Sequence, residues 1–408
     1  MTVARAKGTR DLLPADALRF AAAEEAARRI FGGYGYGEIR TPTFEPTELF
    51  ARSVGEATDI VHKEMFTFQD RGGRSLTLRP ENTAGVVRAV VENRLDQAPM
   101  PLRLWYAGAQ FRYERPQKGR YREFRQIGAE LFGAPGPAAD AEILVMLFEF
   151  LGALGFRELS VSLNAVPAGA GRERFSDALR TFAGARADRL GEDDRRRLAE
   201  NPLRLFDSKD PEAAAMLENA PRAIEFLDPE SRAHHDAVME LLRAHGIPFA
   251  EDPRLVRGLD YYTKTVFEVK SASLGAQDAI LGGGRYDRLV ADLGGPPLPA
   301  VGFAIGEDRL VDVMPLDAAV PAGRVRVIPL GPEQEGYALS VAGRLRAASP
   351  VECDLSGRGV KKGLAAAAEL GFDEAAIVGP DEAREGTVTI KNLKTREQRT
   401  IALPPAGR

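Results

Sequence analysis

The spacing of apolar and polar positions predicts that the first part of the chain is rich in β-strands. Met65–Asp70 and Ser75–Arg79 are short runs on either side of an Asp-Arg-Gly-Gly turn, which is typical of a β-hairpin. Leu102–Arg112 predicts a longer strand, and the run that ends at Phe132 predicts its partner across a basic loop. Ala139–Leu154 is strongly apolar and predicts a buried helix.

Upstream of the first hairpin, the pattern predicts two helices and one strand. Asp16 is placed to cap a helix that extends through Arg29, because an aspartate before an Ala- and Arg-rich run is a common helix start. Glu38–Pro46 predicts a strand that ends at prolines, and Thr47–Val54 predicts the helix after it.

Between about Pro167 and Ile247, Arg, Glu, Asp and Ala replace the alternating β-branched residues. We therefore expect a helical insertion over 167–250. Its predicted helices are Ser176–Leu190, Pro211–Leu217 and Pro229–His245. Strand patterns return at Arg254–Val269, Asp278–Leu281 and Ala300–Ile305. The insertion thus interrupts a β-rich domain over 1–320.

The pattern changes again after Val311–Gly323, which we interpret as a linker because it holds prolines and small residues. Strand and helix patterns alternate from Val325 to Leu403. This alternation predicts a small, largely parallel α/β domain over 324–408.

The composition is that of an ordinary globular protein of two or three domains. The chain has 408 residues, of which 44% are hydrophobic and 28% charged, with 55 basic and 59 acidic side chains. With this balance, a polyanion-binding protein must cluster its basic residues. The single cysteine, Cys353, excludes an intramolecular disulfide and a cysteine-rich zinc site.

Targeting signals and membrane spans are not expected. The N-terminus has no apolar signal core, and the apolar run Ala141–Phe156 is interrupted by Glu142 and Glu149 and is too short to cross a bilayer. With the single cysteine, these features predict a cytoplasmic protein without membrane contact.

The loop between the two long strands is basic and leads into a polar strand face. Its basic residues are Arg115, Lys118, Arg120 and Arg122. Gln126, Gly128 and Glu130 share one parity and therefore one face of the outgoing strand. Carboxylate and amide groups beside arginines suit a ligand with a cationic part and a polyphosphate part. A solvated hairpin with a polar outer face explains the same pattern.

Two further clusters mix charge with turn residues. Glu81 and Thr83 lie at a strand-to-helix corner, where they could hold an ammonium group or cap the helix. Arg257 lies in an apolar strand context, in which a charge needs a partner. A phosphate would serve, and so would Asp260.

A third cluster combines glycines with an arginine. Gly282-Gly-Gly284 and the glycines of Gly302–Gly306 mark the close approach of a backbone or a ligand. Arg309 follows in the first turn of a predicted helix, where the macrodipole also favours anions. The sequence has no Gly-x-x-x-x-Gly-Lys-[Ser/Thr] loop and no Gly-x-Ser-x-Gly elbow, and its four histidines lack metal-motif spacing.

Several separated motifs resemble those of class II aminoacyl-tRNA synthetases and follow the same order. Phe111-Arg-Tyr-Glu-Arg-Pro116 resembles their motif 2, Gly302–Leu310 resembles motif 3, and Pro42 matches the proline of the dimer-forming motif 1. The segments that resemble histidyl-tRNA synthetases in particular are Leu255–Tyr262, Gly283–Asp287, Leu78–Thr83, Gln126–Glu130 and Gly359–Gly363. The resemblance covers essentially the whole chain.

The resemblance implies a class II fold: an antiparallel sheet flanked by helices, with a C-terminal α/β domain of the anticodon-binding type. It implies that histidine and ATP give histidyl-adenylate and pyrophosphate. The histidyl group would then pass to the 3′ end of tRNA(His), with release of AMP. The enzyme would be a homodimer formed through motif 1.

The resemblance also assigns roles to individual residues. Histidine would be bound by Glu81, Thr83, Arg112, Gln126, Glu130, Arg257, Tyr261 and Tyr262. ATP would be bound by Arg112, Arg120, Arg122 and Arg309. Arg112 and Arg257 would be the catalytic pair, and Arg257 would take the place of a catalytic metal. The acceptor end of the tRNA would meet Arg115 and Gln117, and Gly128 would leave the gap in which the amino acid lies.

Mg²⁺ would accompany ATP as part of the substrate, and we expect no protein-bound zinc because the insertion has no cysteine. The insertion would grip the acceptor stem and the C-terminal domain would meet the anticodon, although Leu364–Leu370 is less charged than in the family. One alternative is a regulatory subunit of ATP phosphoribosyltransferase, which shares the fold and binds histidine as a feedback signal. Another is a ligase paralogue that acts on something other than tRNA.

Overall fold

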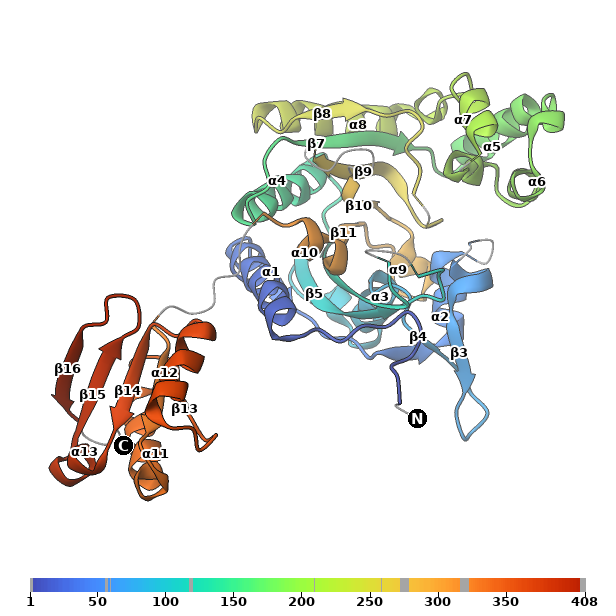
Figure 1. Cartoon of the computed structure of the whole chain (residues 1–408). Coiled ribbons are helices and arrows are strands. Elements are labelled where there is room, and N and C mark those ends of the chain that lie inside the picture. Colours follow the sequence, from blue (N-terminus) through green and yellow to red (C-terminus); the bar gives the residue numbers. More distant parts are fainter. Residues whose placement is uncertain are drawn as a thin grey trace. The chain divides into compact units, whose positions relative to one another are not determined.

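In the computed structural model, the chain forms two compact units, Met1–Asp317 and Ala318–Arg408 (Figure 1). The structure describes residues 3–55, 58, 60–116, 120–208, 210–257, 259–271, 279–315 and 323–403. The first unit contains the larger sheet and the predicted insertion, and the second contains a small α/β fold.

The first unit is built on a sheet of eight strands within the described residues. In spatial order these strands are β1 (Gly37–Glu38), β5 (Leu102–Phe111), β6 (Glu123–Phe132), β11 (Ala300–Gly306), β10 (Ala279–Arg285), β9 (Thr263–Ser271), β7 (Leu159–Val166) and β8 (Phe249–Glu251). The outer pairs β1–β5 and β7–β8 are parallel, and the inner pairs are antiparallel. The middle of the sheet therefore consists of segments far apart in the chain.

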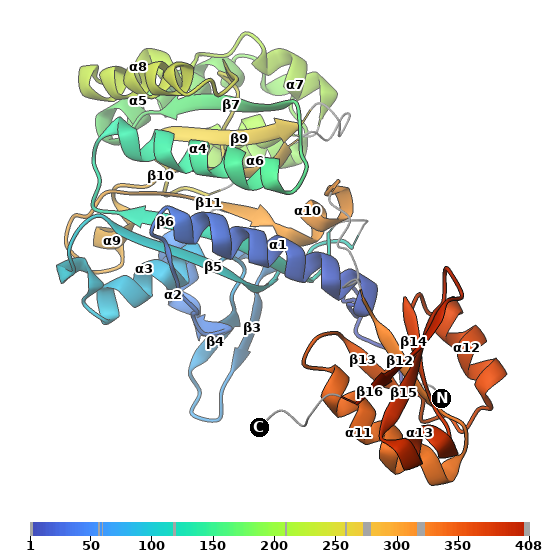
Figure 2. The same ribbon diagram turned by 90° about the vertical axis from the view of Figure 1, so that its left-hand side faces the viewer.

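Helices cover both faces of this sheet (Figures 1 and 2). The helices concerned are α1 (Pro14–Gly33), α4 (Pro137–Ala153), α8 (Pro229–Ala244), α3 (Thr83–Glu92) and α9 (Leu289–Asp292). The apolar sides of α1 and α4 form one core with alternate side chains of β5 and β6, such as Trp105 and Ile127. The side chains between them, such as Tyr106, point to the opposite face and join a second core with α3 and α9. The predicted antiparallel sheet flanked by helices is confirmed.

A smaller sheet corrects one prediction near the N-terminus. Its order is β2 (Phe44–Pro46), β4 (Ser75–Leu78), β3 (Phe66–Gln69), so the predicted hairpin is present. The single strand predicted over Glu38–Pro46 is wrong, because β1 pairs in the large sheet and β2 in the small one. Pro42 lies between them and lacks the backbone N–H that a continuous ladder needs.

Helix α2 (Thr47–Val54) follows β2 directly, as predicted. The predicted cap of the first helix is wrong: α1 begins at Pro14, after Leu13, and no side chain caps it. Proline at the first position supplies a helical φ and has no N–H to satisfy, so the helix starts before Asp16.

The insertion between β7 and β8 is helical, as predicted. Its elements before α8 are α5 (Gly169–Gly184), α6 (Glu192–Glu200), the short η4 (Pro202–Asp207) and α7 (Pro211–Leu217). Two small cores hold these elements together, one around Leu205 and one around Phe175. Helix α6 was not expected, because its sequence is almost entirely charged and has no apolar stripe.

The second unit is an α/β fold with five described strands in the order β13-β12-β14-β15-β16. These elements are β12 (Val325–Pro329), α11 (Glu335–Leu345), β13 (Val351–Cys353), α12 (Val360–Glu369), β14 (Glu374–Val378), α13 (Pro380–Glu385), β15 (Thr387–Asn392) and β16 (Gln398–Ala402). The sheet is parallel between β13, β12 and β14, and antiparallel from there to β16. The prediction of a largely parallel sheet is thus only half right, because the short connection between β15 and β16 permits only an antiparallel pair.

Candidate active site

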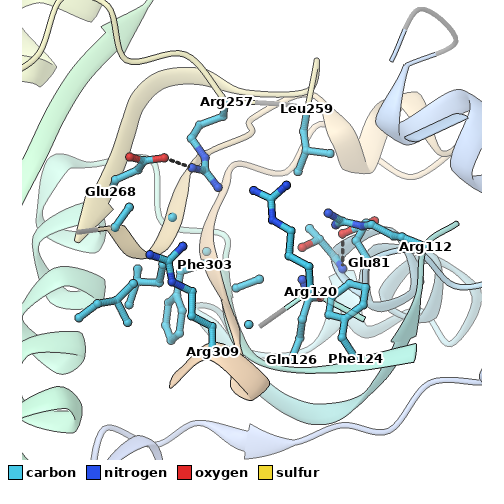
Figure 3. A pocket seen from close by; sticks show the side chains of 18 of the residues that line it. Glu81, Arg112, Arg120, Phe124, Gln126, Arg257, Leu259, Glu268, Phe303 and Arg309 are labelled. Atoms are coloured by element: carbon cyan, nitrogen blue, oxygen red, sulfur yellow. Dashed lines mark hydrogen bonds and ion pairs between the residues drawn. The ribbon is translucent and has the colours of Figure 1, made fainter. Parts of the chain in front are cut away.

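A cavity of about 850 Å³ lies over the middle strands of the large sheet (Figure 3). Side chains from β6, β9 and β11 and from the chain before β9 line it. The part of 254–262 that the structure describes contains no strand, contrary to prediction. Arg257, Tyr261 and Tyr262 therefore reach the cavity from a loop.

Glu130 forms the buried acidic centre of the cavity. It is 1% exposed, and Thr83 Oγ1 donates a hydrogen bond of 2.7 Å to its Oε1. The hydroxyl of Tyr286 donates to Oε2, and that of Tyr106 lies 3.4 Å from Oε1. Burial raises the pKa of Glu130 to about 8, against the opposing effect of these hydroxyl donors. The carboxyl therefore retains a proton over much of the neutral range.

The sheet register explains why β11 has glycine opposite Glu130. Gly302 pairs with Glu130, and a Cβ atom at Gly302 would collide with Glu130 Oε2 and with the carbonyl of Ala129. The glycine thus leaves the room that the buried carboxyl occupies.

The prediction for Gly128 is wrong. Tyr106 lies directly opposite Gly128 on β5, and a Cβ atom at Gly128 would overlap the end of the phenol ring of Tyr106. The gap is therefore filled by a tyrosine of the same protein. That tyrosine brings its hydroxyl to Glu130, so the glycine shapes the wall of the cavity.

Glu81 has the capping role that was one of its two interpretations. Its Oε2 accepts from the N–H of Thr83 at 2.8 Å and its Oε1 from that of Ala84 at 2.9 Å, at the start of α3. It is also 4% exposed and lines the cavity, and burial raises its pKa. Gln126 lines the cavity as well, and within the described part of the chain its buried Oε1 has no hydrogen-bond partner.

Four arginines border the same cavity: Arg112, Arg120, Arg257 and Arg309 (Figure 3). Arg112 donates from Nε to the carbonyl of Pro80 at 2.8 Å. Arg120 lies in the loop before β6 and is 54% exposed. Arg309 belongs to α10 (Glu307–Val313), which follows β11 directly. Arginines from separate segments therefore converge on one space beside the buried acid.

Arg257 pairs with Glu268 of β9, and this ion pair lies at the cavity wall (Figure 3). The guanidinium of Arg257 lies over Gly282, where a Cβ atom would overlap it. The alternative in which Asp260 is the partner of Arg257 is wrong, because Asp260 contacts Arg204 and Arg172 of the insertion instead.

Comparisons with known proteins agree over nearly the whole chain. The family model of histidyl-tRNA synthetase matches residues 8–310, and that of the anticodon binding domain matches residues 324–404. The histidine--tRNA ligase of Thermosynechococcus vestitus is 46% identical over 396 residues, which cover 96% of this chain and 92% of the relative. That of Rubrobacter xylanophilus is 45% identical over 100% of this chain and 98% of the relative.

This chain belongs to the histidyl-tRNA synthetase family. The crystal structure of apo Staphylococcus aureus histidyl-tRNA synthetase has the same fold, with a TM-score of 0.81, 34% sequence identity and coverage of 98% of both chains.

The cavity of this histidyl-tRNA synthetase family member gathers most of the residues predicted from sequence. Those that line it are Glu81, Thr83, Arg112, Arg120, Gln126, Glu130, Arg257, Tyr261, Tyr262 and Arg309. The structure does not bring Arg122 to it. The guanidinium of Arg122 stacks 3.7 Å from the ring centre of Tyr113, and its Nε lies 3.4 Å from the carbonyl of Glu114. Arg115 is exposed on the same loop, and Gln117 lies outside the described residues.

The reasoning from sequence missed three side chains that contact Glu130 or Arg257: Tyr106, Tyr286 and Glu268. Tyr286 was part of the Gly-Gly-Arg-Tyr-Asp segment that carries the family resemblance, which was a usable signal. Tyr106 and Glu268 lie in strands with ordinary alternation, and only the register of the sheet shows their role. Among the described residues, no cluster of His, Cys, Asp or Glu could hold a metal ion, and no helix is long and apolar enough to cross a membrane.

Proposed function

We propose that this protein attaches L-histidine to tRNA(His) in an ATP-dependent reaction with a histidyl-adenylate intermediate. The observation that carries the proposal is a single cavity that joins a buried carboxyl, ringed by hydroxyl groups, to four arginines. The first part suits the cationic or hydrogen-bonding groups of histidine, and the second suits the phosphates of ATP.

The histidine end of the cavity is formed by Glu130 and its neighbours. Glu130, Gln126 and Tyr262 would read the imidazole, while Tyr261 lines the pocket. Glu81 and Thr83 would bind the α-amino group. A binding site made of buried polar groups discriminates against amino acids whose side chains leave those groups unpaired. The unpartnered oxygen of Gln126 fits this role, because a donor of the ligand would satisfy it.

The phosphate end offsets the repulsion between two anions. In the first step a carboxylate oxygen of histidine attacks the α-phosphorus of ATP, and the bond to the bridging oxygen breaks to release pyrophosphate. Arg112 and Arg257 would hold the α-phosphate and the histidine carboxylate, and Arg120 and Arg309 the outer phosphates. Such fixed positive charges stabilise charge in the transition state without reorganisation.

Arg257 would serve where related enzymes use a catalytic metal, and Mg²⁺ would enter with ATP as part of the substrate. The ion pair with Glu268 supports this, because it keeps the guanidinium at the cavity wall before the nucleotide arrives. In the second step the terminal ribose hydroxyl of tRNA attacks the histidyl carbonyl, and AMP leaves.

For the tRNA, the exposed loop with Arg115 and Gln117 would meet the acceptor end. The insertion would grip the acceptor stem, and the C-terminal domain over 324–408 would meet the anticodon. The anticodon-binding family match supports the last of these roles. Homodimer formation stays an expectation from the resemblance to motif 1, and a cytoplasmic location stays an expectation from the N-terminal sequence and the single cysteine.

Two assays on the purified protein test the proposal. Histidine-dependent exchange between ATP and pyrophosphate should be robust, and it would exclude a regulator that only senses histidine. Charging of purified tRNA(His) with labelled histidine should follow, and it would exclude a ligase of another acceptor. Absence of histidine-dependent exchange in folded protein would refute the proposal.

The comparisons favour the ligase over the regulatory subunit, because relatives named histidine--tRNA ligase align over the whole chain.

A further inference from the structure

Asp260 lies at the junction of the cavity loop and the helical insertion. Its Oδ1 accepts from Arg204 Nη2 at 3.0 Å and from Asn201 Nδ2 at 3.0 Å. Arg172 of α5 donates to its backbone carbonyl at 3.1 Å, with another guanidinium nitrogen 3.8 Å from Oδ1. Two separate elements of the insertion therefore bind one residue of the loop.

The other side of Asp260 is held by the end of helix α2. The backbone N–H of Asp260 donates to the carbonyl of Val54 at 3.3 Å. Gly55 has a φ of 101°, and a Cβ atom there would lie 2.5 Å from Asp260 Oδ2. Glycine thus allows the carboxylate to lie close against the backbone. Asp260 is therefore held by the insertion on one side and by the end of α2 on the other.

The residues that follow Asp260 lead to the buried acid of the histidine pocket. The rings of Tyr261 and Tyr262 lie 4.8 Å apart, and that of Tyr261 lies 5.5 Å from the ring of Tyr286. The hydroxyl of Tyr286 donates to Glu130. A displacement of Asp260 would therefore move the aromatic wall and a donor of Glu130, because close-packed side chains transmit shifts.

The contact between Asp260 and the insertion depends on charge, because Asp260 pairs with Arg204 and Arg172. Burial lowers the pKa of Arg172, and Asp260 opposes that shift. Arg204 also pairs with Asp207 at 3.3 Å, and burial raises the pKa of Asp207. Partly buried guanidinium groups need their carboxylates, so removing the charge of Asp260 leaves Arg204 with Asp207 alone and takes from Arg172 the carboxylate 3.8 Å away.

We infer that Asp260 is a positioning residue that couples the helical insertion to the histidine end of the cavity. It acts through Tyr261 and Tyr286 and does not itself contact the substrates. The inference rests on the proposed function, because it assumes that this end of the cavity binds histidine. It predicts that variants on either side of the junction impair histidine binding in the absence of tRNA.

The test compares Asp260→Asn and Arg204→Gln with Arg180→Gln in histidine-dependent ATP–pyrophosphate exchange without tRNA. Arg180 lies in α5 of the same insertion and pairs only with the exposed Asp177 in the described structure, so it is a matched control. The first two variants should raise the KM for histidine about tenfold, with kcat and the KM for ATP changed less than about threefold. Arg180→Gln should behave as the wild type.

A double variant separates coupling from general damage. Asp260→Asn with Arg204→Gln should be no worse than either single variant, because both changes break one link. Asp260→Glu, which retains the charge, should recover part of the histidine affinity. If Asp260→Asn does not fold, Arg204→Gln decides the outcome alone.

An unchanged KM for histidine in folded Arg204→Gln protein would overturn the inference. So would equal losses in kcat and in both KM values together with a lower melting temperature, since these indicate a purely structural role. A wild-type protein without histidine-dependent exchange would instead refute the proposed function.

Discussion

At the scale of single residues, the cavity depends on glycines that leave room for charged side chains. Gly302 accommodates the carboxyl of Glu130, and Gly282 accommodates the guanidinium of Arg257. Both lie in paired strands, where glycine is otherwise unfavourable because it costs entropy and packs nothing. Their positions are explained by the side chains that they admit.

Gly282→Ala should lower activity by moving Arg257. The added methyl group would overlap the guanidinium, which is the flexible end of a side chain and can move away without unfolding the strand. We expect kcat for ATP–pyrophosphate exchange to fall at least tenfold.

Arg257→Ala should lose on the order of 3 kcal/mol of transition-state stabilisation in the same exchange assay, as for a lost oxyanion donor.

The matched control for Gly282→Ala is Gly152→Ala in α4, where a Cβ atom would meet nothing within 4 Å. That variant should retain full activity. Wild-type kcat in Gly282→Ala protein would contradict the assignment of Arg257 to the catalytic step.

Glu130 should give the protein a measurable pH-dependent stability. Its pKa is raised to about 8 in the folded state, so between about pH 4.5 and 8 the unfolded chain ionises while the folded one keeps the proton. The contribution of Glu130 to the free energy of unfolding therefore falls as pH rises through this window, by at most about 1.4 kcal/mol per pH unit. Glu130→Gln cannot ionise and should lack that part of the slope.

Urea unfolding of the first unit at pH 5 and at pH 8 measures the pH-dependent stability of the wild type and of Glu130→Gln. Relative to that of the wild type, the unfolding free energy of Glu130→Gln should be higher at pH 8 than at pH 5. Glu173→Gln, at an exposed position of α5, serves as the control and should follow the wild type. Parallel pH profiles of wild type and Glu130→Gln would show that Glu130 is already ionised in the folded protein.

At the scale of elements, α10 is fixed to the sheet by ionic contacts that lie beside Arg309. Asp308 accepts from Arg10 Nη2 at 2.7 Å and from the backbone N–H of Arg125 at 2.6 Å. Glu307 accepts from Arg125 Nε at 3.1 Å, and Arg125 also pairs with Glu24 of α1. The N-terminal segment, α1 and β6 thus set the position of α10.

Arg10→Ala should weaken ATP binding without altering histidine binding. Loss of the bond to Asp308 frees one side of α10, and with it the placement of Arg309 at the phosphate end. We expect the KM for ATP to rise about threefold to tenfold and the KM for histidine to stay within twofold in the exchange assay. Arg5→Ala, at an exposed arginine 3.6 Å from Asp11, is the control. Equal effects of the two substitutions would argue against a role for this contact.

The elements were easier to predict than the contacts between them. Apolar periodicity identified β5, β6, α4 and the C-terminal alternation, because each pattern is local. The filling of Gly128 by Tyr106 and the pairing of Arg257 with Glu268 depend on sheet register and loop path, which no local pattern determines. The partners of Asp260 in the insertion are likewise 56 to 88 residues away in the chain.

At the scale of the whole molecule, the two compact units divide the chain in a way that can be tested. All cavity residues belong to Met1–Asp317, and the second unit has its own core around Val327, Val341 and Ile390. We therefore expect that adenylate formation requires only the first unit, while recognition of the whole tRNA would draw on both.

A fragment of residues 1–317 should retain histidine-dependent ATP–pyrophosphate exchange within about fivefold of the full chain. Its rate of charging tRNA(His) at low tRNA concentration should fall more than tenfold, because contacts of the second unit to the tRNA backbone and anticodon would be lost. The comparison is made at one ionic strength, since phosphate contacts weaken with salt. Circular dichroism and thermal unfolding of the fragment control for its folding. Unchanged charging would mean that the second unit does not contribute to tRNA binding, and loss of exchange in a folded fragment would mean that it supports the cavity.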